Sequence, residues 1–318
     1  MKPAYPTSPA EQAVFTLSID FELMWGTVDR PYAADFHSIC ESERRDVIDR
    51  LLVLFEEFDI SATWGIVGHL FLNQPKQADP AHHGQPGLYY APDLVERIRR
   101  CKVRQDIGSH TFRHIEMSQS KCSRETAVAD VAECVRQADQ WGIEMKSFIF
   151  PRNLVGHLDV LKGHGFTCYR GPEPHWYARK RRSVRRLGHL LEIASARTPP
   201  TVIPVEEDGV WNIAGSMLYT PSFGTRRYLP VWMRVLRAKR GLDRAVTRKR
   251  IFHMWLHPTD LVCRKDAMMD GLRRIVEHAA NLRAAGKLVV RPMCDLVPAA
   301  EFAEFELANC ESEAPVVA

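Results

Sequence analysis

Short runs of strand-forming residues alternate along this chain with longer segments of helical periodicity. The strand-like runs lie at residues 14–19, 61–67, 106–108, 147–150, 251–256 and 287–291. The helical segments lie at residues 44–58, 92–101, 123–141 and 268–285. Such alternation is typical of parallel β-α-β units, in which functional residues gather at the carboxyl ends of the strands. We therefore expect an α/β fold with its chemistry directly after its strands.

The alternation stops between about residues 172 and 250, where proline and arginine are frequent. Strands are expected there at 202–205 and 210–213, and a basic helix at 229–239. We interpret this part as an elaborated basic insertion. With 318 residues, 45% of them hydrophobic, the chain can bury the core of one large α/β barrel or of two small domains.

The cysteines favour a reducing compartment. Eight of them are spread along the chain without a CxxC pair, which argues against a disulfide framework. The N-terminal residues contain no apolar segment typical of a secretion signal, and no apolar run approaches the roughly 18 residues of a membrane span. We therefore expect a cytoplasmic protein.

Two carboxylates close the first strand-like run. Asp20 and Glu22 are separated by Phe21, and because side chains alternate across a strand they share one face. Paired carboxylates at the end of a strand can serve one catalytic site, although a solvated strand end is the commoner case. Their position makes them candidates for metal binding or acid–base chemistry.

Histidines follow two other strand-like runs. His110 and His114, in the sequence HTFRH, come directly after the run at 106–108. If this segment begins a helical turn, the two side chains project from one face with Cβ atoms about 5–6 Å apart, a spacing that suits two ligands of one divalent metal. His257 follows the run at 251–256 and would meet the other candidates at the same mouth of a barrel.

In this order and spacing, the motifs resemble those of the polysaccharide deacetylase family with the NodB homology domain, carbohydrate esterase family 4. The similar segments are LSIDFE, ATWGIVG, DIGSHTFRH, FIFPRN and MWLHP. Together they cover roughly residues 15–170 and 250–292. The resemblance implies a distorted (β/α) barrel of the polysaccharide-deacetylase type.

The resemblance also implies a domain organisation. A single barrel domain would occupy residues 14–298 and contain the basic insertion at 172–250. From the N-terminal sequence itself, which contains no apolar segment, we expect residues 1–13 to form a disordered lead, and residues 299–318 would form a C-terminal tail.

The resemblance assigns a metal site to three residues. Glu22, His110 and His114 match the family's metal ligands, which would hold one divalent ion, expected to be zinc. The family usually has two adjacent aspartates in its first motif, whereas this chain has Asp20-Phe21-Glu22. The longer glutamate leaves open which of the two carboxylates binds the metal.

Three further residues match catalytic positions of the family. Asp20 would take the proton of the attacking water, and a protonated His257 would donate to the leaving amine. Arg152 is the counterpart of an arginine that tethers the base, but it follows Pro151, whereas the family's arginine precedes its proline. Arg152 would therefore either tether Asp20 or pair with a structural carboxylate.

The resemblance therefore implies a metal-dependent hydrolase that removes an N-acetyl or O-acetyl group from a sugar, in surface polysaccharide or glycan biosynthesis. The same motifs are compatible with another C–N hydrolase of this fold, acting on a cyclic imide, a ureide or a formyl-sugar. A sugar-binding relative without catalysis is the third alternative.

Positive charge is concentrated in two stretches of the insertion. Residues 175–191 contain six Arg and Lys and no acidic residue, and residues 226–250 contain ten against one, Asp243. Between the arginines of 228–239, apolar residues recur at three- and four-residue steps, which is typical of a helix that lies on an anionic membrane.

We therefore hypothesise that the insertion docks the enzyme on the inner leaflet, near a lipid-linked or otherwise anionic glycan. A solvated insertion that pairs with the acidic remainder of the chain is the alternative. No nucleic-acid-binding motif accompanies the arginines, so we expect no nucleic-acid partner.

Overall fold

Ten strands form one curved sheet in the computed structural model, which describes residues 12–28, 36–74, 85–174 and 196–297. The strands are β1 (Ala13–Phe21), β2 (Thr63–Ile66), β3 (Asp106–Ser109), β4 (Ser147–Ile149), β5 (Cys168–Arg170), β6 (Val205–Glu207), β7 (Val210–Asn212), β8 (Met217–Leu218), β9 (Ile251–Leu256) and β10 (Leu288–Val290). Their order is β6-β7-β5-β4-β3-β2-β1-β9-β8, and β10 pairs with the first residues of β1. Paired strands in these ranges run parallel, except β6 and β7.

The segment from β7 to β8 links the two ends of this row of strands. β7 lies beside β5, and β8, shortly after it in the chain, lies beside β9. Between them, the Ile213 N–H donates to the carbonyl of Tyr169 and the Ser216 N–H donates to that of His253, at 2.9 and 2.7 Å. Because the strands of the barrel are parallel, their carboxyl ends meet at one mouth.

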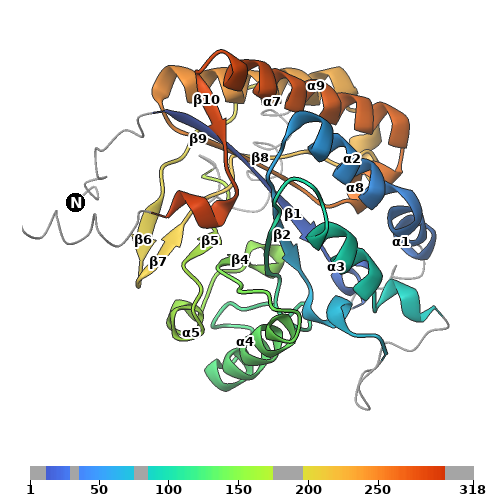
Figure 1. The fold of residues 1–318 in the computed structure, drawn as a ribbon, viewed down its shortest axis with the longest axis vertical. Helices are drawn as coiled ribbons and strands as arrows, with labels where there is room; N and C mark the ends of the chain where they lie inside the picture. The colour runs from blue at the N-terminus through green and yellow to red at the C-terminus, as the bar shows by residue number, and fades with distance from the viewer. Residues whose placement is uncertain (1–11, 29–35, 75–84, 175–195, 298–318) are drawn as a thin grey trace, which may run out of the picture.

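The helices cover the outside of the sheet, with α7 and α9 side by side at one side and α4 and α5 at the opposite side (Figure 1). The α-helices are α1 (His37–Ser42), α2 (Ile48–Phe58), α3 (Pro92–Arg99), α4 (Arg124–Asp139), α5 (Leu158–Gly163), α7 (Val231–Arg248), α8 (Thr259–Val262) and α9 (Lys265–Ala284). A π-helical turn, Glu43–Val47, joins α1 to α2. The 3₁₀ turns are Leu23–Gly26, Gly68–Phe71, Pro86–Leu88, Pro151–Asn153, Gly224–Tyr228 and Met293–Leu296.

The central strand β1 separates two environments. All of its residues are buried. The odd-numbered residues from Phe15 to Phe21 belong to the large apolar core that the sheet shares with the helices. Because side chains alternate, Thr16, Ser18 and Asp20 face the interior of the barrel instead. A polar interior of this kind can support charged groups at the mouth.

The predicted distorted (β/α) barrel is confirmed, and most predicted elements lie within a few residues of their observed bounds. Ser123 caps the N-terminus of α4, since its hydroxyl accepts a hydrogen bond from the Thr126 N–H at 3.2 Å. The described part of 172–250 is integrated into the barrel, because it supplies β6, β7, β8 and the outer helix α7.

Several expectations fall on residues that the structure does not describe. The lead at 1–13, except for its last two residues, the basic stretch at 175–191 and the tail at 299–318 lie outside the described ranges. The domain boundaries therefore stay a prediction. Within the described ranges, no helix combines the length and the apolar character that crossing a bilayer requires.

Candidate metal centre

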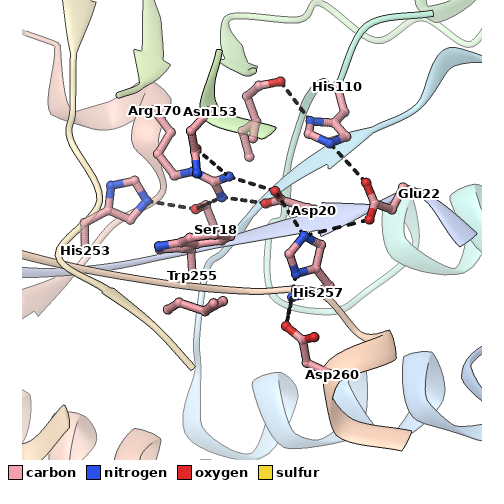
Figure 2. Close-up of polar contacts among 12 residues, drawn as sticks. Ser18, Asp20, Glu22, His110, Asn153, Arg170, His253, Trp255, His257 and Asp260 are labelled. Atoms are coloured by element: carbon pink, nitrogen blue, oxygen red, sulfur yellow. Dashed lines mark hydrogen bonds and ion pairs between the residues drawn. The ribbon is translucent and has the colours of Figure 1, made fainter. Parts of the chain in front are cut away.

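Side chains from four strand ends meet at the carboxyl mouth of the barrel (Figure 2). Asp20 and Phe21 are the last two residues of β1, and Glu22 directly follows the strand. His110 follows β3, Arg170 ends β5 and His257 follows β9. The sequence-predicted residues at β1, β3 and β9 are thus brought together because their strands are parallel and close to one another in the sheet.

Glu22, His110 and His114 form a group that could hold a metal ion, with one donor atom of each within 4.8 Å of the others. The Glu22 carboxylate lies 2.8 Å from Nε2 of His114 and 3.3 Å from Nε2 of His110. Burial alone would raise the pKa of Glu22, but the charge of His114 and hydrogen bonds from both histidines hold that pKa well below its usual range. The carboxylate is therefore ionised, as a metal ligand must be.

This donor set fits a zinc-like ion. Two imidazole nitrogens and one carboxylate oxygen are the protein ligands of many catalytic zinc sites, and they leave a further position open for water or substrate. A hydrogen bond at 2.8 Å between Nδ1 of His110 and the carbonyl of Ile149 turns Nε2 toward Glu22. Such an outer contact fixes the ring and its tautomer for metal binding.

The two histidines converge through a bent loop, and the predicted helical turn is wrong. Thr111 and His114 both have left-handed backbone conformations, with φ of 61° and 56°. The buried Asp130 of α4 holds the loop, because its carboxylate accepts hydrogen bonds from the N–H groups of Phe112 at 2.6 Å and Arg113 at 3.1 Å. A loop that is pinned in this way fixes the position of His114.

Asp20 is held by a buried arginine. Arg170 Nη1 and Nη2 lie 2.5 and 2.7 Å from the two carboxylate oxygens, and Arg170 also reaches the Ser18 hydroxyl and the Asn153 amide oxygen. Burial opposes ionisation of Asp20, but the charge of Arg170 and its hydrogen bonds outweigh burial and lower the pKa of that carboxyl. Asp20 is therefore a carboxylate at neutral pH with a fixed orientation.

The tether of Asp20 was expected at Arg152, and the structure corrects this expectation. Arg152 forms an ion pair with Glu116, which is the alternative that the sequence left open. The cause is local geometry: Arg152 and Asn153 have left-handed φ values of 56° and 54°, which carry the chain away after β4. The guanidinium that reaches Asp20 comes from the next strand in the sheet.

His257 lies between the two carboxylates. Its Nε2 is 3.7 Å from Asp20 and 3.8 Å from Glu22, and its Nδ1 is 3.0 Å from the Asp260 carboxylate. Burial would lower the pKa of His257, but the charge and hydrogen bond of Asp260, followed by Glu22 and Asp20, raise it to about 10. His257 is thus positively charged at neutral pH and can donate a proton.

A second histidine of the same strand is neutral. His253 is fully buried, with its ring nitrogens 2.8 Å from the Ser18 hydroxyl and 2.9 Å from the Ile213 carbonyl. Burial and the nearby charge of Arg170 lower the pKa of His253 to about 3. It therefore supports Ser18 below the site.

Three residues that shape the site were not predicted from the sequence. A weak sequence signal could have indicated Arg170, because this arginine ends a short strand-forming segment. Another weak signal could have indicated Asp260, because this acid lies three residues after His257. Asp130 had none, because it is a single acid in a helix whose partner loop is distant in sequence.

Comparison of the sequence with protein-family models and with curated protein sequences gave no significant match. The three-dimensional fold is that of polysaccharide deacetylases. A Mycobacterium smegmatis protein assigned as a polysaccharide deacetylase superposes with a TM-score of 0.65 at 14% identity, over 100% of this chain and 98% of its own.

Two further solved structures are similar to the same extent. A Pseudomonas aeruginosa PAO1 protein, also assigned as a polysaccharide deacetylase, has a TM-score of 0.64 at 13% identity, over 93% of each chain. PuuE allantoinase has a TM-score of 0.63 at 13% identity, over 93% of each chain. At these identities the likeness establishes the fold, while the chemistry depends on the residues at the mouth.

Proposed function

We propose that this protein is a metal-dependent hydrolase that removes an acetyl group from nitrogen or oxygen of a carbohydrate. The observation that carries the proposal is the convergence of the group Glu22, His110 and His114 with Asp20 and His257 at one mouth. The resemblance of the sequence motifs to those of polysaccharide deacetylases and the shared fold support the same reaction class.

The residues divide the chemistry between them. A divalent ion, proposed to be zinc, would polarise the acetyl carbonyl and make water a stronger acid. The Asp20 carboxylate, ionised and fixed by Arg170, accepts the proton of the attacking water. The His257 imidazolium donates a proton from Nε2 to the leaving nitrogen, which is a very poor leaving group without it. An ester oxygen needs that proton less.

Metal analysis combined with acetate release tests the proposal. The purified protein should bind one divalent ion, preferably zinc, and release acetate from at least one member of a panel of N- and O-acetylated sugars. Glu22→Gln and His114→Ala should lose both metal and activity. Asp20→Asn should keep the metal and lose activity, by about 10²–10⁴-fold for loss of a general base. Loss of metal from Asp20→Asn with retention in Glu22→Gln would mean that the carboxylate roles are exchanged.

A second candidate is hydrolysis of another C–N bond, in a cyclic imide, a ureide or a formyl-sugar. The structural likeness to an allantoinase supports this alternative reaction. Release of formate or of a ring-opened acid, with no acetate from any sugar, would establish it in place of the deacetylase. A catalytically inactive sugar-binding relative would bind metal and sugar and release neither product.

We further propose that the protein is cytoplasmic and touches an anionic inner leaflet near a lipid-linked substrate. The support is an exposed patch of aromatic and basic residues, in which the side chains of Tyr228 and Trp232 are 73% and 58% exposed. Arg226, Arg227 and Arg240 are exposed as well. Trp and Arg at the end of a basic helix suit a lipid headgroup region.

Liposome co-sedimentation tests this contact. Binding should require anionic lipid, weaken as salt rises, and fall in the double variant Trp232→Ala/Arg227→Gln. Equal sedimentation with neutral and anionic vesicles would refute the contact and leave the hydrolase proposal intact.

A further inference from the structure

A cavity of about 320 Å³ opens beside the candidate metal centre. His114 contributes to its wall, so the cavity adjoins the group of residues that could hold the metal. It lies between the loop after β3 and the start of α4 on one side and Arg152, after β4, on the other. Its volume is at the lower end of the roughly 300–1,000 Å³ that small-molecule sites occupy.

Positive charge dominates the polar lining. Arg113, Lys121 and Arg152 contribute three cations, and Glu116 contributes the one carboxylate among the described lining residues. Glu116 is shared, because it pairs with Arg152 and lies 4.0 Å from Lys121. With one carboxylate for three cations, the lining keeps an excess of two positive charges when His114 is neutral.

Arg113 stands out among these cations. Its side chain is exposed and forms no ion pair within 4.0 Å in the described part of the chain, although its charge acts on the buried Asp130 carboxylate. Its backbone, by contrast, is fixed, since the Arg113 N–H donates to the buried Asp130 carboxylate at 3.1 Å. Arg113 also directly precedes the metal-group residue His114. A guanidinium on a pinned backbone next to the reacting centre can bind a substrate group at a defined distance from it.

We propose that this cavity is an anion subsite, which binds a carboxylate or phosphate carried by the same sugar whose acyl group is hydrolysed. Arginine favours these anions because its planar donors match two oxygens at once. The inference rests on the proposed function and adds its substrate class: an acidic or phosphorylated acetamido sugar. The apolar lining residues Ile115 and Val28 contact the sugar face, while the cations bind its anion.

Matched sugars test the subsite. The zinc-loaded protein is assayed for acetate release from neutral N-acetylglucosamine, from its 1- and 6-phosphates and from N-acetylglucosaminuronic acid. At least one anionic sugar should have a kcat/KM about tenfold or more above the neutral one, which corresponds to one charge-assisted contact. The preference should shrink as salt rises. The phosphates and the uronic acid distinguish the two anion types.

The double variant Arg113→Gln/Lys121→Gln should lose that preference and leave kcat/KM for the neutral sugar within about twofold. Arg274→Gln/Lys287→Gln removes the same charge from exposed positions in the middle of α9 and just beyond its end, and should retain the preference. Helix α9 lies on the side of the molecule opposite to α4, whose start borders the cavity (Figure 1). The proposal is overturned if no anionic sugar is preferred, or if both double variants change the preference equally.

Failure of the proposed function would be distinguishable. If no sugar releases acetate, equilibrium binding of the same four sugars to the zinc-loaded protein is measured instead. Tighter binding of an anionic sugar that disappears in Arg113→Gln/Lys121→Gln supports the subsite although the deacetylase proposal has failed. Equal binding of charged and neutral sugars overturns the subsite as well.

Discussion

Replacement of Arg170 by methionine removes one half of a buried ion pair. The side chains of Arg170 and Asp20 are 1% and 4% exposed, and two hydrogen bonds of 2.5 and 2.7 Å join them. Methionine is similar in length and keeps an apolar contact with the ring of Trp255, over which the guanidinium lies at 4.2 Å. It carries no charge and no donor, so Asp20 loses both hydrogen bonds and its nearest counter-charge and keeps only the His257 imidazolium, 3.7 Å away.

Loss of one partner of a buried pair costs about 3–5 kcal/mol, because the remaining charge is uncompensated. Since a domain is stabilised by about 5–15 kcal/mol in total, the free energy of unfolding should fall by a large part without abolishing folding.

The dependence on pH has a definite sign. In the wild type the pKa of Asp20 is lowered, so the pair stabilises the fold at neutral pH and is lost only as pH falls below about 3.9. In Arg170→Met, burial is opposed only by the weaker effect of the charges of His257 and His110, so the pKa of Asp20 should rise. Protonation then relieves the buried charge, so the difference in unfolding free energy between variant and wild type should shrink as pH is lowered from about 8 to about 5.

Urea unfolding at several pH values, with metal removed by a chelator, measures these differences. The double variant Asp20→Asn/Arg170→Met has no buried charge at this place and should regain most of the lost stability while it remains inactive. The reasoning is refuted if Arg170→Met unfolds within about 1 kcal/mol of the wild type at every pH, which is below the cost of a buried unpaired charge. It is refuted equally if the double variant is no more stable than the single one.

Two other substitutions probe the proton donor and the metal group. Asp260→Asn removes the main stabiliser of the His257 imidazolium, so the pKa of His257 should fall from about 10 toward about 6.5 and the alkaline limb of the kcat/KM profile should move to lower pH. An unmoved limb would exclude His257 as the proton donor. A methyl group at Gly26 would overlap the Glu22 carboxylate, whereas one at Gly163 meets nothing within 4 Å. Gly26→Ala should therefore weaken zinc binding about tenfold or more in a competition titration, and the control variant Gly163→Ala should bind zinc as the wild type does. If the two variants bind zinc with equal affinity, Glu22 does not bind the metal.

The sequence predicted the elements best where local periodicity and burial agree. The bounds of β9 are those expected, because six consecutive buried residues leave little choice of structure. The candidate residues at the ends of β1, β3 and β9 could be placed at one mouth because parallel strands must end on the same side. Their mutual distances could not, since these depend on loops such as the one that carries His114.

The tether of Asp20 shows where sequence reasoning stops. Arg152 and Arg170 both follow or end a strand near the site, and both are arginines in a polar context. The left-handed backbone at Arg152 and Asn153 decides between them, because it directs Arg152 to Glu116. Nothing in the sequence around Pro151 indicates a left-handed backbone conformation at Arg152. Only the three-dimensional structure therefore shows which of the two arginines binds Asp20.

The basic helix α7 was interpreted as a membrane-binding helix from the spacing of its charged and apolar residues. That spacing does not distinguish its buried arginines from its exposed ones. Arg234 is 1% exposed and donates to the carbonyls of Thr220, Pro221, Arg226 and Leu229, so it ties the preceding loop to the helix. Arg237 is also buried and bonds the carbonyl of Arg197. Because charge on a helix face is normally taken as solvated, the pattern could not distinguish these arginines from the exposed Arg240.

The consequence bears on how the membrane hypothesis can be tested. Replacement of Arg234 or Arg237 by glutamine would leave backbone carbonyls of the loop without their donors, at a cost of about 1–3 kcal/mol for each unsatisfied buried group. A loss of lipid binding in such variants would then report a disturbed loop as readily as a lost charge. Only the outward-facing residues around Trp232 separate the two, since their removal changes the surface and leaves the buried hydrogen bonds of Arg234 in place.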